Sequence, residues 1–209
     1  MQELEVINTL LGGHRITING FKKCVGDKTS LSVCEIGCGG GDNLKAIFRY
    51  ASKRGILVNM IGIDLKQECI DYAKENCREI VNAQWICADY KQAQLPSDPD
   101  IIFSSLFCHH FSDEGLAEIF EWMNQHAKSG FFINDLQRHP LAFYSIKFLT
   151  SIFSRSYLVK NDAPLSVRRG FHQSELRKQV NTALQKDNSW KYEIHWQWAF
   201  RWLVTGIKK

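Results

Sequence analysis

The stretch from Val33 to Asp42, which reads VCEIGCGGGD, constrains the fold of this chain more than any other. An apolar run ends at Ile36, four glycines follow within five residues, and a helical pattern begins near Asn43. Glycine permits the backbone dihedrals of a tight turn and has no Cβ atom to block a ligand. The free N–H groups of a following helix attract a carboxylate or a phosphate. We therefore predict a strand, a turn and a helix whose backbone binds a ligand.

The spacing of the glycines decides between classes of nucleotide site. A dinucleotide fingerprint has glycine at the first, third and sixth positions, but counting from Gly37 the sixth residue is Asp42. No Gly-Lys-Ser/Thr ending follows, so the turn is not a P-loop. The pattern is acidic-x-Gly-x-Gly-x-Gly, which resembles the first motif of the class I S-adenosylmethionine-dependent methyltransferases. It consists of Glu35, Gly37, Gly39 and Gly41.

Two acidic residues end the next predicted strands. Asp64 follows the apolar run 57–63 and lies 23 residues after Gly41, close to the interval of about 20 residues from a glycine turn to the carboxylate that binds ribose hydroxyls. The alternative is an Asp that caps the helix from Gln67. Asp89 follows the short run 84–88. The resemblance implies that Asp89 accepts a hydrogen bond from an adenine amino group, and the alternative is an ordinary turn residue.

The run 101–111 enters a loop that carries His109 and His110, and small-molecule methyltransferases often have a similar His-His after their fourth strand. Histidine suits a general base for an oxygen nucleophile because its pKa lies near neutrality. A structural role for His110 at the start of the helix over 113–128 is the alternative, and His139 is a further candidate. The resemblance implies cofactor contacts at Glu35, Gly37, Gly39, Gly41, Asp64, Leu65, Asp89, Tyr90, Ser105 and Leu106.

The order of elements predicts a single α/β domain over 1–209. We expect a helical segment within 1–30, with helix over 3–26. Strands are expected near 31–36, 57–63, 84–88, 100–105 and 130–135, and helices near 43–54, 67–81 and 113–128. Alternation of this kind favours a parallel sheet with helices on both faces. A helix near 173–186 and an antiparallel pair over 190–194 and 200–207 resemble the end of a Rossmann-like, seven-stranded methyltransferase sheet whose last strand is antiparallel.

The alternation stops over 136–170, which we interpret as a helical insertion that covers the substrate. Residues 141–153 are apolar at helical spacing, and Phe143 and Tyr144 are expected to face the substrate. A loop is expected over 161–171. Packing on the sheet, a contact between two copies of the chain, and a peripheral membrane contact are the alternatives. The runs 134–138 and 162–169 resemble a bacterial subgroup related to quinone-biosynthesis enzymes and linked to polyketide-type aromatic substrates.

Composition agrees with a globular protein. Hydrophobic residues make up 44% and charged residues 23%, and the formal net charge of +4 comes from dispersed Lys and Arg, so no nucleic-acid partner is expected. Seven cysteines without a Cys-x-x-Cys pair indicate reduced thiols in a cytoplasmic protein. Residues Cys108, His109 and His110 are adjacent and rarely converge on zinc, so no metal is expected. No signal peptide or membrane span is predicted.

The leading hypothesis is an S-adenosylmethionine-dependent methyltransferase that acts on a small aromatic or apolar molecule, with O-methylation favoured. Arg138, Arg168 and Arg169 are candidates to bind an anionic group of that molecule. A nucleic-acid or protein methyltransferase is one alternative. The Ser104-Ser105-Leu106-Phe107 run lacks the Asn/Asp-Pro-Pro-aromatic pattern of enzymes that methylate base amino groups. A non-catalytic module that binds S-adenosylmethionine is another.

Overall fold

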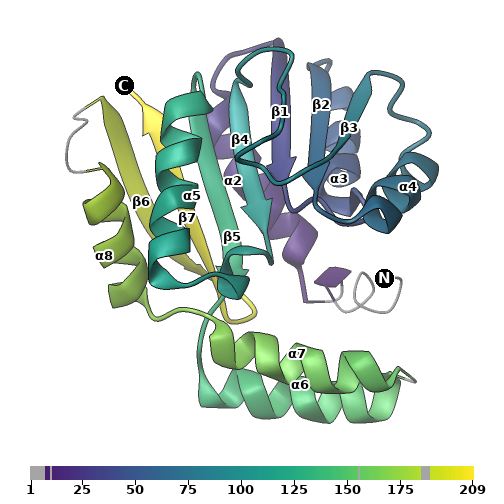
Figure 1. The fold of residues 1–209 in the computed structure, drawn as a ribbon, viewed down its shortest axis with the longest axis vertical. Helices are drawn as coiled ribbons and strands as arrows, with labels where there is room; N and C mark the ends of the chain where they lie inside the picture. The colour runs from purple at the N-terminus through teal and green to yellow at the C-terminus, as the bar shows by residue number, and fades with distance from the viewer. Residues whose placement is uncertain (1–7, 10, 155, 185–188) are drawn as a thin grey trace.

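The computed structural model of the chain describes residues 8–9, 11–154, 156–184 and 189–209. A seven-stranded sheet of order β3-β2-β1-β4-β5-β7-β6 forms its centre (Figure 1). Strands β1 to β5 are parallel, and β7 is antiparallel to both of its neighbours, so the predicted sheet is confirmed. The strands are β1 (Ser30–Ile36), β2 (Leu57–Asp64), β3 (Ala83–Cys87), β4 (Ile101–Ser105), β5 (Gly130–Leu136), β6 (Trp190–Gln197) and β7 (Arg201–Lys208).

Helices cover both faces of the sheet. On one face lie α2 (Gly13–Val25), α3 (Asp42–Ser52) and α4 (Gln67–Asn76), packed on alternate strand residues such as Val33 and Phe103. On the other face, α5 (Asp113–His126) and α8 (Gln173–Leu184) pack on the strand residues between them, such as Cys34 and Ile102. Strands buried on both faces explain the continuous apolar runs in the sequence.

Two helices differ in length from the prediction. Of the expected helix over 3–26, residues 1–7 and 10 lie outside the described residues, and α2 begins only after Gly12, whose φ of 75° is left-handed. The helix expected over 67–81 ends at Asn76. The side-chain amide of Asn76 donates to the carbonyl of Gly40 at 2.9 Å and to Oδ1 of Asp42 at 2.6 Å. The end of α4 is therefore tied to the glycine turn.

The prediction of a loop over 161–171 is wrong. Most of this range belongs to helix α7 (Tyr157–Arg169), which contains Pro164 in its interior. The Asn-Asp-Ala-Pro sequence favours a turn locally. Packing outweighs that preference, because Val167 is buried in a small cluster with Ala142 and Ile146 of the neighbouring helix α6 (Pro140–Phe153). Helix α6 begins at Pro140 and is capped by His139, whose ring accepts from the backbone N–H of Leu141 at 3.2 Å.

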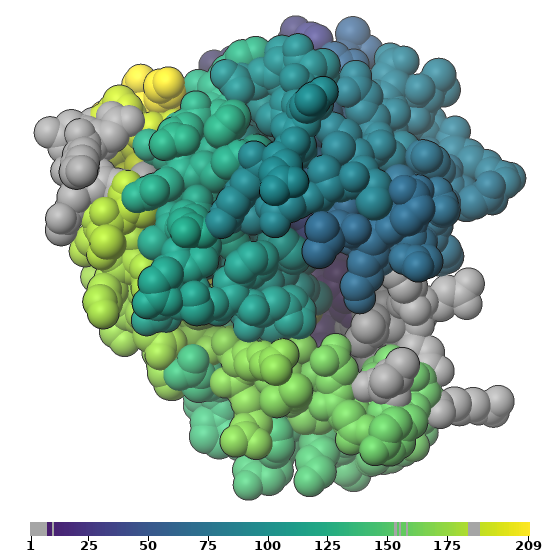
Figure 2. Space-filling model, viewed as in Figure 1, coloured from purple at the N-terminus to yellow at the C-terminus, as the bar shows by residue number. Residues whose placement is uncertain are grey.

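Helices α6 and α7 lie side by side below the carboxyl ends of β4 and β5, and form the lower green part of the molecule in the space-filling view (Figures 1 and 2). They form the helical insertion after β5 that the sequence predicts. The outer side of α6 carries exposed apolar side chains. A contact between two copies of the chain, one of the alternatives for the segment 136–170, stays a prediction. These side chains are Leu141, Tyr144, Phe148 and Ile152. In the described part of the chain, no helix is long and apolar enough to cross a bilayer.

Candidate active site

The candidate site lies at the carboxyl edge of the sheet, where β1 to β5 all end. From β1 the strands are added toward one edge of the sheet as far as β3, and from β4 they are added toward the other edge. Ligands of doubly wound sheets bind at such a switch point, here between β1 and β4. Parallel register brings the predicted residues to one edge. Glu35 pairs with Gly62 and Phe103, Asp64 with Cys87, and Ser105 with Asn134. The structure therefore places on one edge features that the sequence spreads over 100 residues.

The glycines after β1 have different roles. Gly37, Gly39 and Gly41 all have positive φ, of 70°, 51° and 76°. A Cβ atom on Gly37 would lie 2.3 Å from the ring of Phe107, and one on Gly41 would lie 2.7 Å from the side chains of Cys77 and Trp85. A Cβ atom on Gly39 would meet nothing within 4 Å. Gly37 and Gly41 are thus required by packing, whereas Gly39 presents bare backbone to open space where a ligand can approach.

Glu35 is fully buried at the end of β1. Its Oε1 accepts from the Asn43 amide at 3.0 Å, and Oδ1 of Asn43 accepts from the Thr17 hydroxyl at 3.1 Å. Its Oε2 has no hydrogen-bond partner among the described residues. Burial raises the pKa of Glu35 well above its ordinary value, although the Asn43 hydrogen bond opposes this. An unpartnered buried carboxyl oxygen beside the glycine turn is suited to a cationic group of a ligand.

Glu35→Gln is expected to remove a pH-dependent cost of folding. Because the native state of the wild type holds the Glu35 proton more tightly than the unfolded state, wild-type stability falls relative to the variant as pH rises above about 4.3. The fall is at most about 1.4 kcal/mol per pH unit and ends at the raised native pKa. Urea unfolding of both proteins from pH 5 to pH 9 measures it. The control is Glu121→Gln, an exposed carboxylate on α5. Parallel curves for wild type and Glu35→Gln would contradict the raised pKa.

The other predicted cofactor residues lie at neighbouring strand ends. Asp64 accepts from the backbone N–H of Gly39 at 2.9 Å and of Lys66 at 3.0 Å, so it shapes the glycine turn while remaining partly exposed. Leu65 and Asp89 are exposed. The Tyr90 side chain packs in the core with its ring edge-on to Trp122 of α5, and burial raises the pKa of its hydroxyl.

His109 forms a buried pair with Asp135. The residue lies in the short 3-10 helix η1 (Cys108–His110), is 5% exposed, and its Nδ1 lies 2.7 Å from Oδ1 of Asp135. Asp135 also accepts from the backbone N–H of His109 at 3.3 Å and of Leu136 at 2.7 Å. Burial alone would raise the pKa of Asp135, but His109 and these donors hold it below its ordinary value. The ionised carboxylate therefore places the proton on Nδ1 and leaves Nε2 to accept one.

His110, the second predicted catalytic residue, is exposed and stacks at a tilt on His109 with ring centroids 4.2 Å apart. Burial of part of its ring and the neighbouring His109 lower its pKa. Ser105 and Leu106 precede η1. Ser105 accepts from the buried amide of Asn134 at 3.3 Å, and Leu106 has a left-handed φ of 53°. Within the described ranges, no three His, Cys, Asp or Glu side chains are grouped to hold a metal ion.

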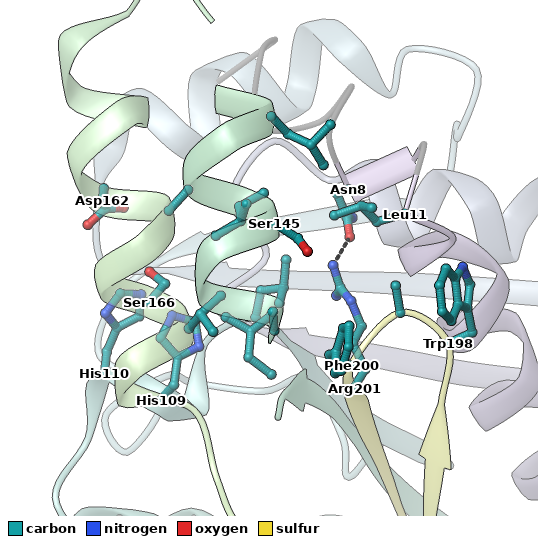
Figure 3. A pocket seen from close by; sticks show the side chains of 18 residues that line it. Asn8, Leu11, His109, His110, Ser145, Asp162, Ser166, Trp198, Phe200 and Arg201 are labelled. Carbon is teal, nitrogen blue, oxygen red and sulfur yellow. Dashed lines mark hydrogen bonds between the residues drawn. The ribbon is translucent and has the colours of Figure 1, made fainter. Parts of the chain in front are cut away.

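A cavity of about 370 Å³ separates the carboxyl ends of β4 and β5 from helices α6 and α7 (Figure 3). Its size is that of a small-molecule site. Phe143 and Tyr144, which are expected from the sequence to face the substrate, do not line it. The α6 side chains that turn inward are Ala142, Ser145, Ile146 and Leu149. The remaining wall includes Leu106, His109, Ser166 and Phe200.

The three arginines singled out from the sequence do not line this cavity. Arg138 instead pairs with Glu175 at 3.0 Å and donates to the carbonyl of Arg168 at 3.1 Å. The arginine in the wall is Arg201, at the start of β7. Sequence reasoning overlooked it, although a lone charge next to the apolar run 202–204 is a usable signal. The roles of Asp135 as partner of His109 and of Asn43 as partner of Glu35 were also missed, because they depend on tertiary contacts.

Known methyltransferases are similar to this chain in sequence and in fold. Residues 33–130 match the family model of the methyltransferase domain. This match agrees with the S-adenosylmethionine-dependent methyltransferase domain expected from the glycine motif. The chain is also 27% identical over 151 residues to the ubiquinone biosynthesis O-methyltransferase of Leptothrix cholodnii, and the alignment covers 69% of this chain. It covers 59% of that relative, so the chain spans about three-fifths of its length.

Solved structures of methyltransferases share the fold of this domain. The plantazolicin methyltransferase BpumL, in complex with a monoazolic desmethylPZN analog and SAH, has a TM-score of 0.71 at 19% identity, covering 97% of this chain and 87% of that one. The magnesium protoporphyrin IX methyltransferase of Synechocystis PCC 6803, with bound SAH, has a TM-score of 0.61 at 15% identity, covering 95% and 84%. The predicted Rossmann-like architecture therefore extends over nearly the whole chain.

Proposed function

We propose that this protein transfers a methyl group from S-adenosylmethionine to a hydroxyl of a small aromatic or apolar molecule. The observation that carries the proposal is the His109–Asp135 pair in the wall of the cavity below β4 and β5. A buried imidazole oriented by a carboxylate beside the cavity favours an enzyme over a module that only binds the cofactor. A cavity of about 370 Å³ fits a small acceptor better than a polymer.

The residues around the glycine turn fit S-adenosylmethionine. The open backbone at Gly39 accommodates a ligand, and the unpartnered Oε2 of Glu35 suits its amino group. Asp64 uses one backbone contact on each oxygen and keeps lone pairs for the ribose hydroxyls. We assign the adenine contacts to Asp89 and to two segments, one around Tyr90 after β3 and one around Leu106 after β4. When bound, S-adenosylmethionine supplies a methyl group already activated on a sulfonium.

The chain itself contributes a base and a closed pocket. His109 takes the proton of the acceptor hydroxyl at Nε2, and Asp135 stabilises the imidazolium that results and holds the ring in place. Helices α6 and α7 cover the acceptor and exclude water, which we assign as the role of the segment 136–170. His110, at the exposed end of η1, contacts the acceptor rather than acting as the base.

The relatives support an aromatic acceptor. One relative is named for ubiquinone biosynthesis, and we place the acceptor of this protein in the quinone or polyketide type. The apolar wall formed by Ile146, Leu149 and Phe200 agrees with such a ring. The test is incubation with methyl-labelled S-adenosylmethionine and a panel of phenols, catechols and aliphatic alcohols. Label in a phenol supports the proposal. Label in none of these hydroxyl compounds contradicts it.

Ser166→Trp is expected to block the acceptor without affecting the cofactor. Ser166 lines the cavity from α7, so an indole there occupies space that the acceptor needs. Methyl transfer should fall at least about tenfold, equivalent to roughly 1.4 kcal/mol, with S-adenosylhomocysteine affinity unchanged by calorimetry. Leu165→Trp is the matched control, because Leu165 is the adjacent residue on α7 and is not part of the cavity wall. Equal activity of the two variants places the acceptor elsewhere.

A further inference from the structure

Arg201 lies in the cavity wall in an unusual state for an arginine. It is 2% exposed, and among the described residues only one of its side-chain nitrogens, Nη2, has a partner, Oδ1 of Asn8 at 3.0 Å. Its Nε and Nη1 are buried and make no hydrogen bond within the described part of the chain. Figure 3 shows the side chain reaching from the β6–β7 hairpin toward Asn8, alongside Ser145 of α6. A buried guanidinium with unused donors is costly unless a ligand completes it.

We propose that Arg201 binds a carboxylate of the acceptor molecule. This deepens the function proposed above and rests on it: the acceptor is a hydroxylated aromatic acid, held by its carboxylate at Arg201 and presented by its hydroxyl to His109. Both side chains line the same cavity, from β7 and from η1. A guanidinium donates to a carboxylate through charge-assisted hydrogen bonds, which are stronger than those between neutral groups. Among the described residues, the guanidinium of Arg201 has a hydrogen bond to the neutral side chain of Asn8 and to no carboxylate.

The charges around Arg201 favour one negative charge on the ligand rather than two. Asp135 acts on Arg201 electrostatically, but its hydrogen bonds go to His109 and Leu136. Asp162 lines the cavity from α7. Both carboxylates repel an anionic ligand, and they repel a dianionic phosphate more than a single carboxylate. Burial lowers the pKa of Arg201 to about 10, so it stays charged at neutral pH.

The test compares a hydroxybenzoate with the matching hydroxybenzamide, which has nearly the same shape but is neutral and carries an NH2 donor in place of one carboxylate oxygen. In calorimetry with S-adenosylhomocysteine present, we expect the wild type to bind the carboxylate about 10- to 100-fold more tightly than the amide. Arg201→Met should abolish the preference, and Arg201→Lys should retain part of it. Arg168→Met is the control, because Arg168 is exposed and outside the cavity wall. Hydroxyphenyl phosphate is included as the dianionic competitor.

The outcomes separate this inference from the proposed function. Arg201→Met removes a buried charge with unused donors, so its melting temperature should not fall. If it does fall, the comparison uses Arg201→Lys, which keeps the positive charge, and a carboxylate preference equal to that of the wild type in this variant contradicts a role for the guanidinium hydrogen bonds. Equal binding of carboxylate and amide by the wild type, or tighter binding of the phosphate, overturns the inference. Methylation of neutral phenols alone leaves the proposed function standing without the carboxylate site. If the carboxylate preference depends on Arg201 but no methyl group is transferred, the carboxylate site stands and the proposed transferase function fails.

Discussion

His109→Ala is expected to reduce methyl transfer by about 10²- to 10⁴-fold, the usual contribution of a general base. The reason is that Asp135 occupies Nδ1, so Nε2 of His109 is the atom left to take the acceptor proton. Affinity for S-adenosylhomocysteine should stay within about twofold, since His109 lies in the acceptor cavity rather than at the glycine turn. The measurement is single-turnover transfer to the acceptor found by labelling. His110→Ala is the matched comparison and should mainly raise KM.

Asp135→Asn tests whether the carboxylate positions the ring. Without the negative charge the imidazolium of His109 is less stabilised, so the acidic limb of the pH–rate profile should move to lower pH and kcat should fall. A purely structural role for Asp135 would lower the melting temperature and leave the profile unmoved. If His109→Ala and His110→Ala have equal effects, or His109→Ala has none, the base is wrongly assigned.

The fold was predictable because its signals are local. The glycine turn, the apolar runs ending in acidic residues and the helical periodicities lie within short windows, and topological rules for parallel sheets then bring the strand ends together. Where the prediction failed, a contact distant in the sequence outweighed a local preference. The Asn-Asp-Ala-Pro sequence indicates a loop, yet α7 forms because Val167 packs on α6.

The cofactor side of the site was more accessible to sequence reasoning than the acceptor side. Glu35, Gly39 and Asp64 belong to one βαβ unit, so their spacing along the chain carries the information. The acceptor cavity combines β5, α6, α7 and the β6–β7 hairpin, and which face of α6 turns inward depends on all of them. The sequence pattern therefore predicts Phe143 and Tyr144 as residues that face the acceptor, whereas Ser145 and Ile146 line the wall.

Gly39→Val is expected to weaken S-adenosylmethionine binding about 100-fold or more, roughly 2.8 kcal/mol, while the protein remains folded. The glycine turn is the cofactor loop in the proposed function, and Gly39 is its one member whose Cβ position is open rather than packed. A valine there fills the space that the ligand needs. Its left-handed φ of 51° adds strain of about 1–2 kcal/mol, which the domain should tolerate. Calorimetry measures the affinity and circular dichroism the fold.

Gly55→Val separates the loss of ligand space from backbone strain. Gly55 also has a positive φ, of 68°, and nothing within 4 Å of its Cβ position, but it precedes β2 at the opposite edge of the sheet. Both variants should therefore lose similar stability, and only Gly39→Val should lose the cofactor. Gly37→Val should instead unfold or expand the turn, because its Cβ would lie 2.3 Å from Phe107. Normal cofactor binding by Gly39→Val would remove this turn from the site, and with it the assignments of Glu35 and Asp64 that depend on a ligand beside Gly39.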